Sequence, residues 1–244
     1  MRVLFVHQNF PGQYRYLAPR LAKEPDVAVV AMGEKPAQVP ETMRYVAYGA
    51  PAGPGARTHH YLRGLEGQVR RGQKALRAAL QLRDEGFVPD VVCSHPGWGE
   101  TMFFRDVFPE AVYVSYFEFF YWAEGADVGF DPEFPASLDD ICRLRVRNAP
   151  HLMALENADL GVTPTRWQKS LLPEAYQPKI HRLHDGVDTR QAAPDPGNHR
   201  FPVTAGRPSS LTLTAVVVVA LQRPQRRRRH AQRTGGRRDA RARR

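Results

Sequence analysis

Seven short apolar runs between Met1 and His184 limit the folds open to this chain more than any other part of its sequence. The apolar residues in each run are largely continuous, which is typical of strands buried on both faces of a parallel sheet. The runs are Arg2–His7, Val27–Met32, Arg44–Tyr48, Val88–Ser94, Ala111–Tyr116, Leu160–Thr163 and Ile180–Leu183. Amphipathic segments separate many of them, so the sequence predicts a Rossmann-like, doubly wound α/β domain with a parallel sheet.

Two of the intervening segments carry clear helix signals. Between Tyr61 and Glu85 the apolar residues recur at spacings of three, four or their multiples, and Gly86 and then Pro89 follow as stop signals. Ser137 is a favourable N-cap for a second helix, in which Pro150 predicts a kink.

The basic charge of the chain is confined to its end. The sequence holds 35 Lys and Arg against 25 Asp and Glu, a net charge of +10, and residues 221–244 alone contain eleven Arg and one Asp. Residues 1–220 are therefore neutral overall, and the charge says nothing about what the folded part binds. We expect residues 221–244 to form a disordered tail, because like charges repel and little apolar surface is available for burial.

Other features of composition point to an ordinary intracellular protein. Cys93 and Cys142 are too few for a disulfide framework, which favours a reducing compartment. The longest apolar stretch, Leu211–Leu221, falls short of the roughly 18 residues expected of a membrane span. The sequence thus predicts a cytoplasmic protein with no transmembrane segment, compatible with peripheral membrane contact.

The loop after the first apolar run argues against one class of enzyme. In an open parallel sheet, ligands bind beyond the carboxyl ends of the strands. The loop from His7 to Arg15 contains one glycine, Gly12, and lacks the G-x-G-x-x-G fingerprint of a nicotinamide or flavin oxidoreductase. Gly12 either opens a helix whose N-terminus approaches a ligand or simply allows a tight strand-to-helix turn.

The loop after the fourth run, Ser94–Glu100, places His95 at the end of a buried strand. An imidazole there can hydrogen-bond a substrate or transfer a proton near neutral pH. Trp98 offers a flat apolar face of the kind on which sugar rings stack. The alternative for His95 is a structural hydrogen bond to a backbone carbonyl.

The aromatic run after the fifth strand contains one carboxylate, Glu118, which needs a partner or a ligand if it is buried. Glu124 and Asp127 follow and leave open a glycosidase-like carboxylate pair, since spacing in sequence does not give their separation in space. No metal-binding motif is present, and His59 and His60 are adjacent, so we expect their side chains to point to different sides.

Six of these segments, in order along the chain, resemble the N-terminal domain of family 4 glycosyltransferases. They are Val6–Tyr14, Ser94–Glu100, Tyr116–Tyr121, Asp127–Phe134, Thr163–Gln168 and His184–Asp188. The resemblance implies the first half of a GT-B architecture, in which two Rossmann-like domains face each other across a cleft. It also implies transfer of a sugar from a nucleotide-sugar donor to a glycan, lipid or small-molecule acceptor, with no bound metal or other cofactor.

The resemblance further implies which residues act. His95 is expected to contact the donor sugar or the reacting centre, as the catalytic residue. Six others are expected to bind substrate, three from the first loop on the acceptor side and three from the later loops along the cleft. These residues are Gly12, Gln13 and Tyr14, followed by Trp98, Glu100 and Glu118.

The end of the sequence departs from the family pattern. A second Rossmann-like domain needs on the order of 150 residues, and far fewer follow Asp188. We therefore expect residues 1–188 to form the N-terminal domain, 189–220 a linker with an aborted start of the second domain, and 221–244 the tail. A truncation or frameshift would leave a chain that holds mainly the acceptor side and is inactive by itself. In the alternative, the tail is a genuine arm for salt-sensitive nucleic-acid binding, although no specific nucleic acid is predicted as a partner.

Overall fold

The computed structural model describes residues 1–126, 128, 129, 131, 133–190, 192 and 193. Within them, seven strands form one parallel sheet in the order β3-β2-β1-β4-β5-β6-β7. The strands are β1 Arg2–Val6, β2 Ala28–Gly33, β3 Met43–Ala47, β4 Val91–Ser94, β5 Val112–Tyr116, β6 Leu160–Thr163 and β7 Ile180–Arg182. Each predicted apolar run overlaps one of these strands, with β2 and β3 each extending one residue beyond the predicted run, so the predicted parallel sheet is confirmed.

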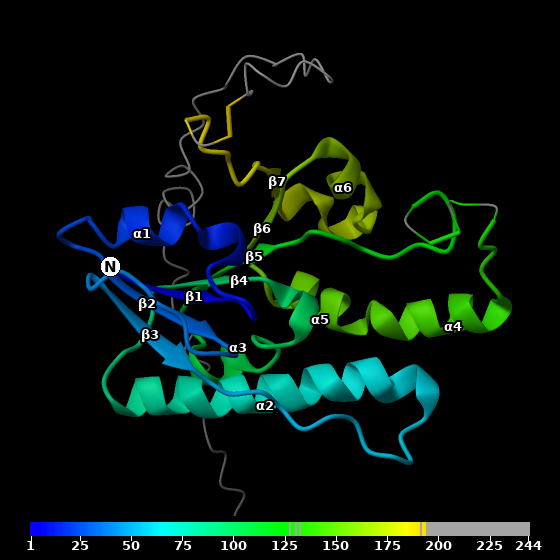
Figure 1. Ribbon diagram of the computed structural model, residues 1–244, viewed down its shortest axis with the longest axis horizontal. Coiled ribbons are helices and arrows are strands. Elements are labelled where there is room, and N and C mark those ends of the chain that lie inside the picture. The colour runs from blue at the N-terminus through cyan, green and yellow to red at the C-terminus, as the bar shows by residue number, and fades with distance from the viewer. Residues whose placement is uncertain (127, 130, 132, 191, 194–244) are drawn as a thin grey trace, which may run out of the picture.

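Helices lie on both faces of the sheet, with α1 on one side and the long α2 on the other (Figure 1). The α-helices are α1 Leu17–Leu21, α2 Arg63–Asp84, α3 Phe104–Val107, α4 Leu138–Arg147, α5 Ala149–Asn157 and α6 Arg166–Leu171. Short 3-10 turns are η1 Gly12–Tyr14, η2 His60–Leu62, η3 Pro96–Trp98 and η4 Glu174–Lys179. The arrangement is the predicted doubly wound α/β fold.

The two faces of the sheet have separate hydrophobic cores. On β1, Val3 and Phe5 pack into the cluster that includes α1, whereas Leu4 and Val6 pack into the cluster that includes α2 and α3. All four side chains are fully buried. Successive strand residues point to opposite faces, so burial on both sides requires the continuous apolar runs seen in the sequence.

The segment from Ser137 to Asn157 forms two helices instead of one kinked helix. The Ser137 hydroxyl accepts a hydrogen bond from the Asp140 amide, and the Asp140 carboxylate accepts one from the Ser137 amide. This capping box confirms the predicted N-cap. The prediction of a kink was wrong, because α4 ends at Arg147 and Pro150 lies in the first turn of α5, where its missing amide hydrogen costs nothing.

The strand order places a switch point at the centre of the sheet. The chain moves from β1 outward through β2 to β3 and then returns to β4 on the other side of β1. The loops after β1 and β4 therefore leave the sheet in opposite directions and flank a crevice at its carboxyl edge, where open α/β sheets bind ligands.

The ends of the predicted domain organisation fall largely outside the described residues. The predicted tail, 221–244, lies entirely outside them, as does the predicted linker segment from residue 194 onward. In the part of the chain that the structure describes, no helix is both long enough and apolar enough to span a membrane.

Candidate functional site

The loops after β1, β4 and β5 bring three polar side chains together at the carboxyl edge of the sheet. The ring centroids of His7 and His95 lie 5.3 Å apart. His95 Nε2 lies 3.2 Å from Glu118 Oε2. Two residues that the sequence singled out, His95 and Glu118, are thus in direct contact because they follow neighbouring strands.

The hydrogen bonds of His95 define how its ring is oriented. The Gly97 amide donates to Nδ1 at 3.3 Å, so the lone pair lies on Nδ1 and Nε2–H donates to Glu118. This bond, with the nearby imidazole charge, lowers the pKa of the Glu118 carboxyl. Glu118 is therefore an ionised carboxylate at neutral pH. Among the described residues, the His95 ring bonds to the Gly97 amide and to Glu118, and not to a backbone carbonyl as in the structural alternative.

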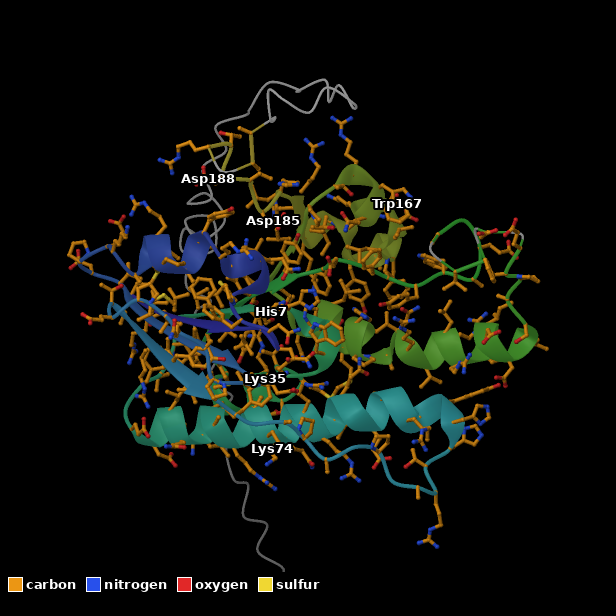
Figure 2. All side chains as sticks on the ribbon, in the orientation of Figure 1. His7, Lys35, Lys74, Trp167, Asp185 and Asp188 are labelled. Atoms are coloured by element: carbon orange, nitrogen blue, oxygen red, sulfur yellow. The ribbon has the colours of Figure 1, made fainter. Side chains whose placement is uncertain are left out.

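His7 is a second buried imidazole that the sequence analysis did not single out. The Asn9 amide donates to its Nδ1 at 3.0 Å. Burial and, secondarily, the charge of His95 lower the pKa of His7 to about 4, so the ring is neutral at physiological pH. Figure 2 shows His7 in the interior, between α1 and α2. Its position at the end of a buried strand is the same signal that identified His95.

The His7 ring leaves no room for a side chain at residue 12. The φ of Gly12 is +46°, in the left-handed region, and a Cβ built on this residue would lie 2.5 Å from His7 Cε1 and Nε2. A side chain at residue 12 would therefore collide with the buried imidazole. The tight-turn alternative for Gly12 accounts for this geometry without a ligand.

A cavity of about 1070 Å³ opens beside His95. Its walls come from η3, the first turns of α2, the segment after β5, the loop before α4, and helices α4 and α5. Among the side chains that line it are His95, Trp98, Glu118, Tyr121, Arg147 and His151. Three of the predicted site residues, His95, Trp98 and Glu118, thus face one space.

The structure does not bring the other predicted residues to that cavity. Gln13 and Tyr14 line a separate hollow of about 50 Å³, together with Cys93 and His184. Gln13 Oε1 and the Tyr14 hydroxyl are buried there, with no hydrogen-bond partner among the described residues. Gln13 lies beside the His7 ring, but its Oε1 does not meet it with hydrogen-bond geometry.

Glu100 lies beneath η3 and is fully buried. Gly99 ends η3 with φ of +93°, and the Glu100 side chain that follows points into the interior. There its Oε1 accepts a hydrogen bond from the Tyr48 hydroxyl at 3.0 Å. Burial raises the pKa of Glu100 to about 7. The side chain therefore lines neither hollow, in contrast to its expected place along the cleft.

His151 is the other functional candidate that the sequence analysis missed. It lies in the first turn of α5 with 6% of its surface exposed, and its ring meets that of Tyr121 edge-on at 5.7 Å. Burial, followed by the charge of His95, lowers its pKa to about 4. Its Nδ1 is enclosed and has no hydrogen-bond partner in the described chain. No local pattern marks a helical histidine of this kind.

Two further predictions about polar side chains have clear outcomes. His59 and His60 do not point to different sides, because their rings stack with centroids 4.6 Å apart. Even so, no group of three or more metal-ligating side chains among the described residues is arranged to hold a metal ion. Asp127, one half of the possible carboxylate pair, lies outside the described residues.

Comparison with known proteins places the chain in a family. Among solved structures, it is similar to a putative UDP-N-acetylglucosamine 2-epimerase from Listeria monocytogenes, with 14% sequence identity and a TM-score of 0.39. That match covers 73% of this chain and 44% of the epimerase, so the chain spans less than half of that protein's length. No curated protein matches it. The model of the glycosyl transferase family 4 group matches residues 25–192, which is more than half of the sequence, and the chain therefore belongs to the glycosyl transferase family 4 group.

Proposed function

We propose that this protein acts in the transfer of a sugar from a nucleotide-sugar donor to an acceptor, and that its described domain holds the acceptor in the large cavity. The observation that carries the proposal is the His95–Glu118 pair on the wall of that cavity, at the carboxyl edge of the sheet of a family 4 chain. The donor enters as a substrate, and the proposal needs no bound metal or other cofactor.

Within this proposal His95 contacts the reacting centre. Its Nε2–H points at the Glu118 carboxylate, which fixes the tautomer of the ring and would stabilise positive charge on it. A substrate hydroxyl entering beside the pair can donate to the Glu118 carboxylate, or can replace Glu118 as the acceptor of the Nε2–H hydrogen bond. Glu118 is therefore proposed as a positioning residue that also contacts the substrate.

The remaining predicted residues take different parts in the proposal. Trp98 faces the acceptor directly. Gln13 and Tyr14 would contact substrate through the smaller hollow, where their unpartnered oxygen atoms lie. We propose supporting roles for Gly12 and Glu100: Gly12 admits the His7 ring, and Glu100 anchors the loop beneath η3 to Tyr48.

The donor side is proposed to lie on a second domain, joined after residue 188. The corresponding experiment fuses residues 1–188 to the donor-binding domain of an active family 4 enzyme and supplies labelled nucleotide sugars with saccharide, lipid and small-molecule acceptors. The expected result is label transfer by the fusion, and loss of transfer in the same fusion carrying His95→Ala. The parent enzyme is the positive control.

Two outcomes would count against the proposed function. One is a fusion that is folded by circular dichroism and yet transfers no sugar from any donor. The other is a His95→Ala fusion that transfers as fast as the unsubstituted one. The full chain without the added domain is expected to transfer nothing, and robust transfer by it would contradict the assignment of the donor site to another domain.

A further inference from the structure

The large cavity has an exposed indole in its wall, on a loop that is fixed in place. Trp98 keeps 43% of its surface exposed, although burial of such a side chain is favourable. Gln68 Nε2 donates to the Gly97 carbonyl at 3.0 Å, and the Arg71 guanidinium donates to the Trp98 carbonyl at 3.2 Å. The loop is thereby tied to α2, and the indole is held open toward the cavity.

Close backbone packing adds to this rigidity. Gly99 lies so near α2 that a Cβ on it would be 2.6 Å from the Gln68 carbonyl oxygen. The His95 ring also lies roughly parallel to the Trp98 indole, at 25° and 6.4 Å between centroids. A flat apolar face that is already oriented loses little conformational entropy when a ligand stacks on it.

Another part of the cavity wall offers directed polar groups. Asn148 bonds to both backbone groups of Tyr121, at 3.0 and 2.7 Å. The Arg147 guanidinium lies over the Tyr121 ring at 3.8 Å and donates one hydrogen bond to its hydroxyl. No carboxylate of the described residues pairs with Arg147. Most of its five N–H donors therefore remain available to a ligand.

His151 supplies a polar group that needs a partner. Its imidazole lines the cavity and is more than nine-tenths buried, yet Nδ1 has no hydrogen-bond partner within the described chain. A buried polar atom left without a partner costs about 1–3 kcal/mol. Because Nδ1 is enclosed, a ligand hydroxyl in the cavity would remove that cost by turning the ring so that Nδ1 faces the cavity.

The charges on the wall disfavour a lipid chain as the occupant. Among the described residues, four arginines and three carboxylates line the cavity: Arg63, Arg71, Arg143, Arg147, Glu118, Glu133 and Asp140. The two signs nearly cancel, so the wall does not select a strong anion. An acyl chain would displace water from these charged side chains without forming hydrogen bonds to them, whereas the hydroxyl groups of a polyhydroxylated ligand would form such bonds.

We propose that the large cavity is an oligosaccharide-binding acceptor subsite, in which Trp98 stacks on a sugar ring while Arg147 and His151 bind its hydroxyl groups. This inference rests on the proposed sugar-transfer function and narrows the acceptor to a saccharide. A volume of about 1070 Å³ slightly exceeds the range of about 300–1,000 Å³ that holds a drug-sized ligand. The space therefore has room for more than one sugar ring.

The experiment exposes the full chain to an array of immobilised, uncharged oligosaccharides and, in parallel, to phosphatidylcholine vesicles, because neither carries a net negative charge that would attract the eleven arginines of residues 221–244. We expect retention by at least one oligosaccharide and none by vesicles. Trp98→Ala should weaken retention by at least about tenfold. Trp167→Ala is the matched control, because Trp167 is also an exposed indole but lies on α6, outside the cavity lining (Figure 2). Its retention should equal that of the unsubstituted chain.

A second variant, His151→Phe, separates binding from folding. Because His151 Nδ1 has no partner to lose, replacement by an apolar ring should leave the free energy of unfolding unchanged or raised, and should weaken saccharide retention. A structural imidazole would give the reverse, with lower stability and unchanged retention, and that result would overturn the role of His151.

Three results would overturn the saccharide assignment itself: retention by vesicles only, retention by neither, or undiminished retention of Trp98→Ala. The fusion described above keeps this failure distinct from failure of the proposed function. Transfer to a lipid or small-molecule acceptor alone would sustain sugar transfer and refute the saccharide subsite. Retention on saccharides by a chain whose fusion is inactive would support the saccharide subsite and count against the proposed sugar transfer.

Discussion

The substitution Gly12→Ala tests the packing of the β1 loop against His7. Residue 12 has φ of +46°, and an alanine in the left-handed region costs about 1–2 kcal/mol. The added methyl group would also lie 2.5 Å from two atoms of a buried imidazole, and forced overpacking of this kind costs about 1–3 kcal/mol. Together these effects lower the free energy of unfolding by about 2–5 kcal/mol, a large share of the stability of a typical domain.

Two other glycines separate the two contributions in the same assay, urea unfolding of the full chain followed by circular dichroism. Gly49 has φ of +78° but no atom within 4 Å of its added Cβ, so Gly49→Ala reports backbone strain alone. Gly53 has neither a positive φ nor a close neighbour, so Gly53→Ala should be neutral or stabilise by up to about 1 kcal/mol. Equal losses for Gly12→Ala and Gly49→Ala would refute the inferred contact with His7.

Three further predictions concern protons and capping. Burial lowers the pKa of His151 to about 4 from the usual 6.5, so between these values the unfolded chain binds more protons and the free energy of unfolding falls as the pH is lowered. From pH 6.5 to 4, the free energy of unfolding of His151→Phe should fall by about 3 kcal/mol less than that of the unsubstituted chain. An equal fall in both chains, measured by urea unfolding, would contradict this. His95→Ala removes the hydrogen bond that lowers the pKa of Glu118, so carbon NMR should show that carboxyl titrating closer to its ordinary value; an unchanged titration would mean another group lowers the pKa. Ser137→Ala breaks the capping box of α4 and should lower the free energy of unfolding by about 0.5–2 kcal/mol, and a change within experimental error would show that the cap contributes nothing.

The fold was predictable because burial on both faces of a sheet leaves a direct trace in the sequence. A strand such as β1 must be apolar at successive positions, and its continuous run showed this without any knowledge of its neighbours. The sequence placed His95 and Glu118 after neighbouring apolar runs but did not predict their contact. That contact depends on the strand order, because side chains that follow adjacent parallel strands meet at one edge.

The rest of the site depends on packing that no local pattern encodes. Glu100 lies away from the cavity because Gly99, with a positive φ, directs the chain into the interior, where the Tyr48 hydroxyl donates a hydrogen bond to the Glu100 carboxyl group. His151 lies in the first turn of α5, just after the break between α4 and α5, and a proline in a helical segment fits either a kink or a new first turn. The tertiary structure decides between those two outcomes.

The most direct measurement of the central claim, that the large cavity holds the acceptor, follows the indole N–H signals of the full chain by NMR. The sequence has three tryptophans, and only Trp98 lines the cavity; Trp122 donates its indole hydrogen to the Leu171 carbonyl, and Trp167 lies on α6. During titration with an oligosaccharide retained on the array, the Trp98 signal should shift in a saturable way while the other two stay in place. A shift of Trp122 or Trp167 with no change at Trp98 would contradict the claim.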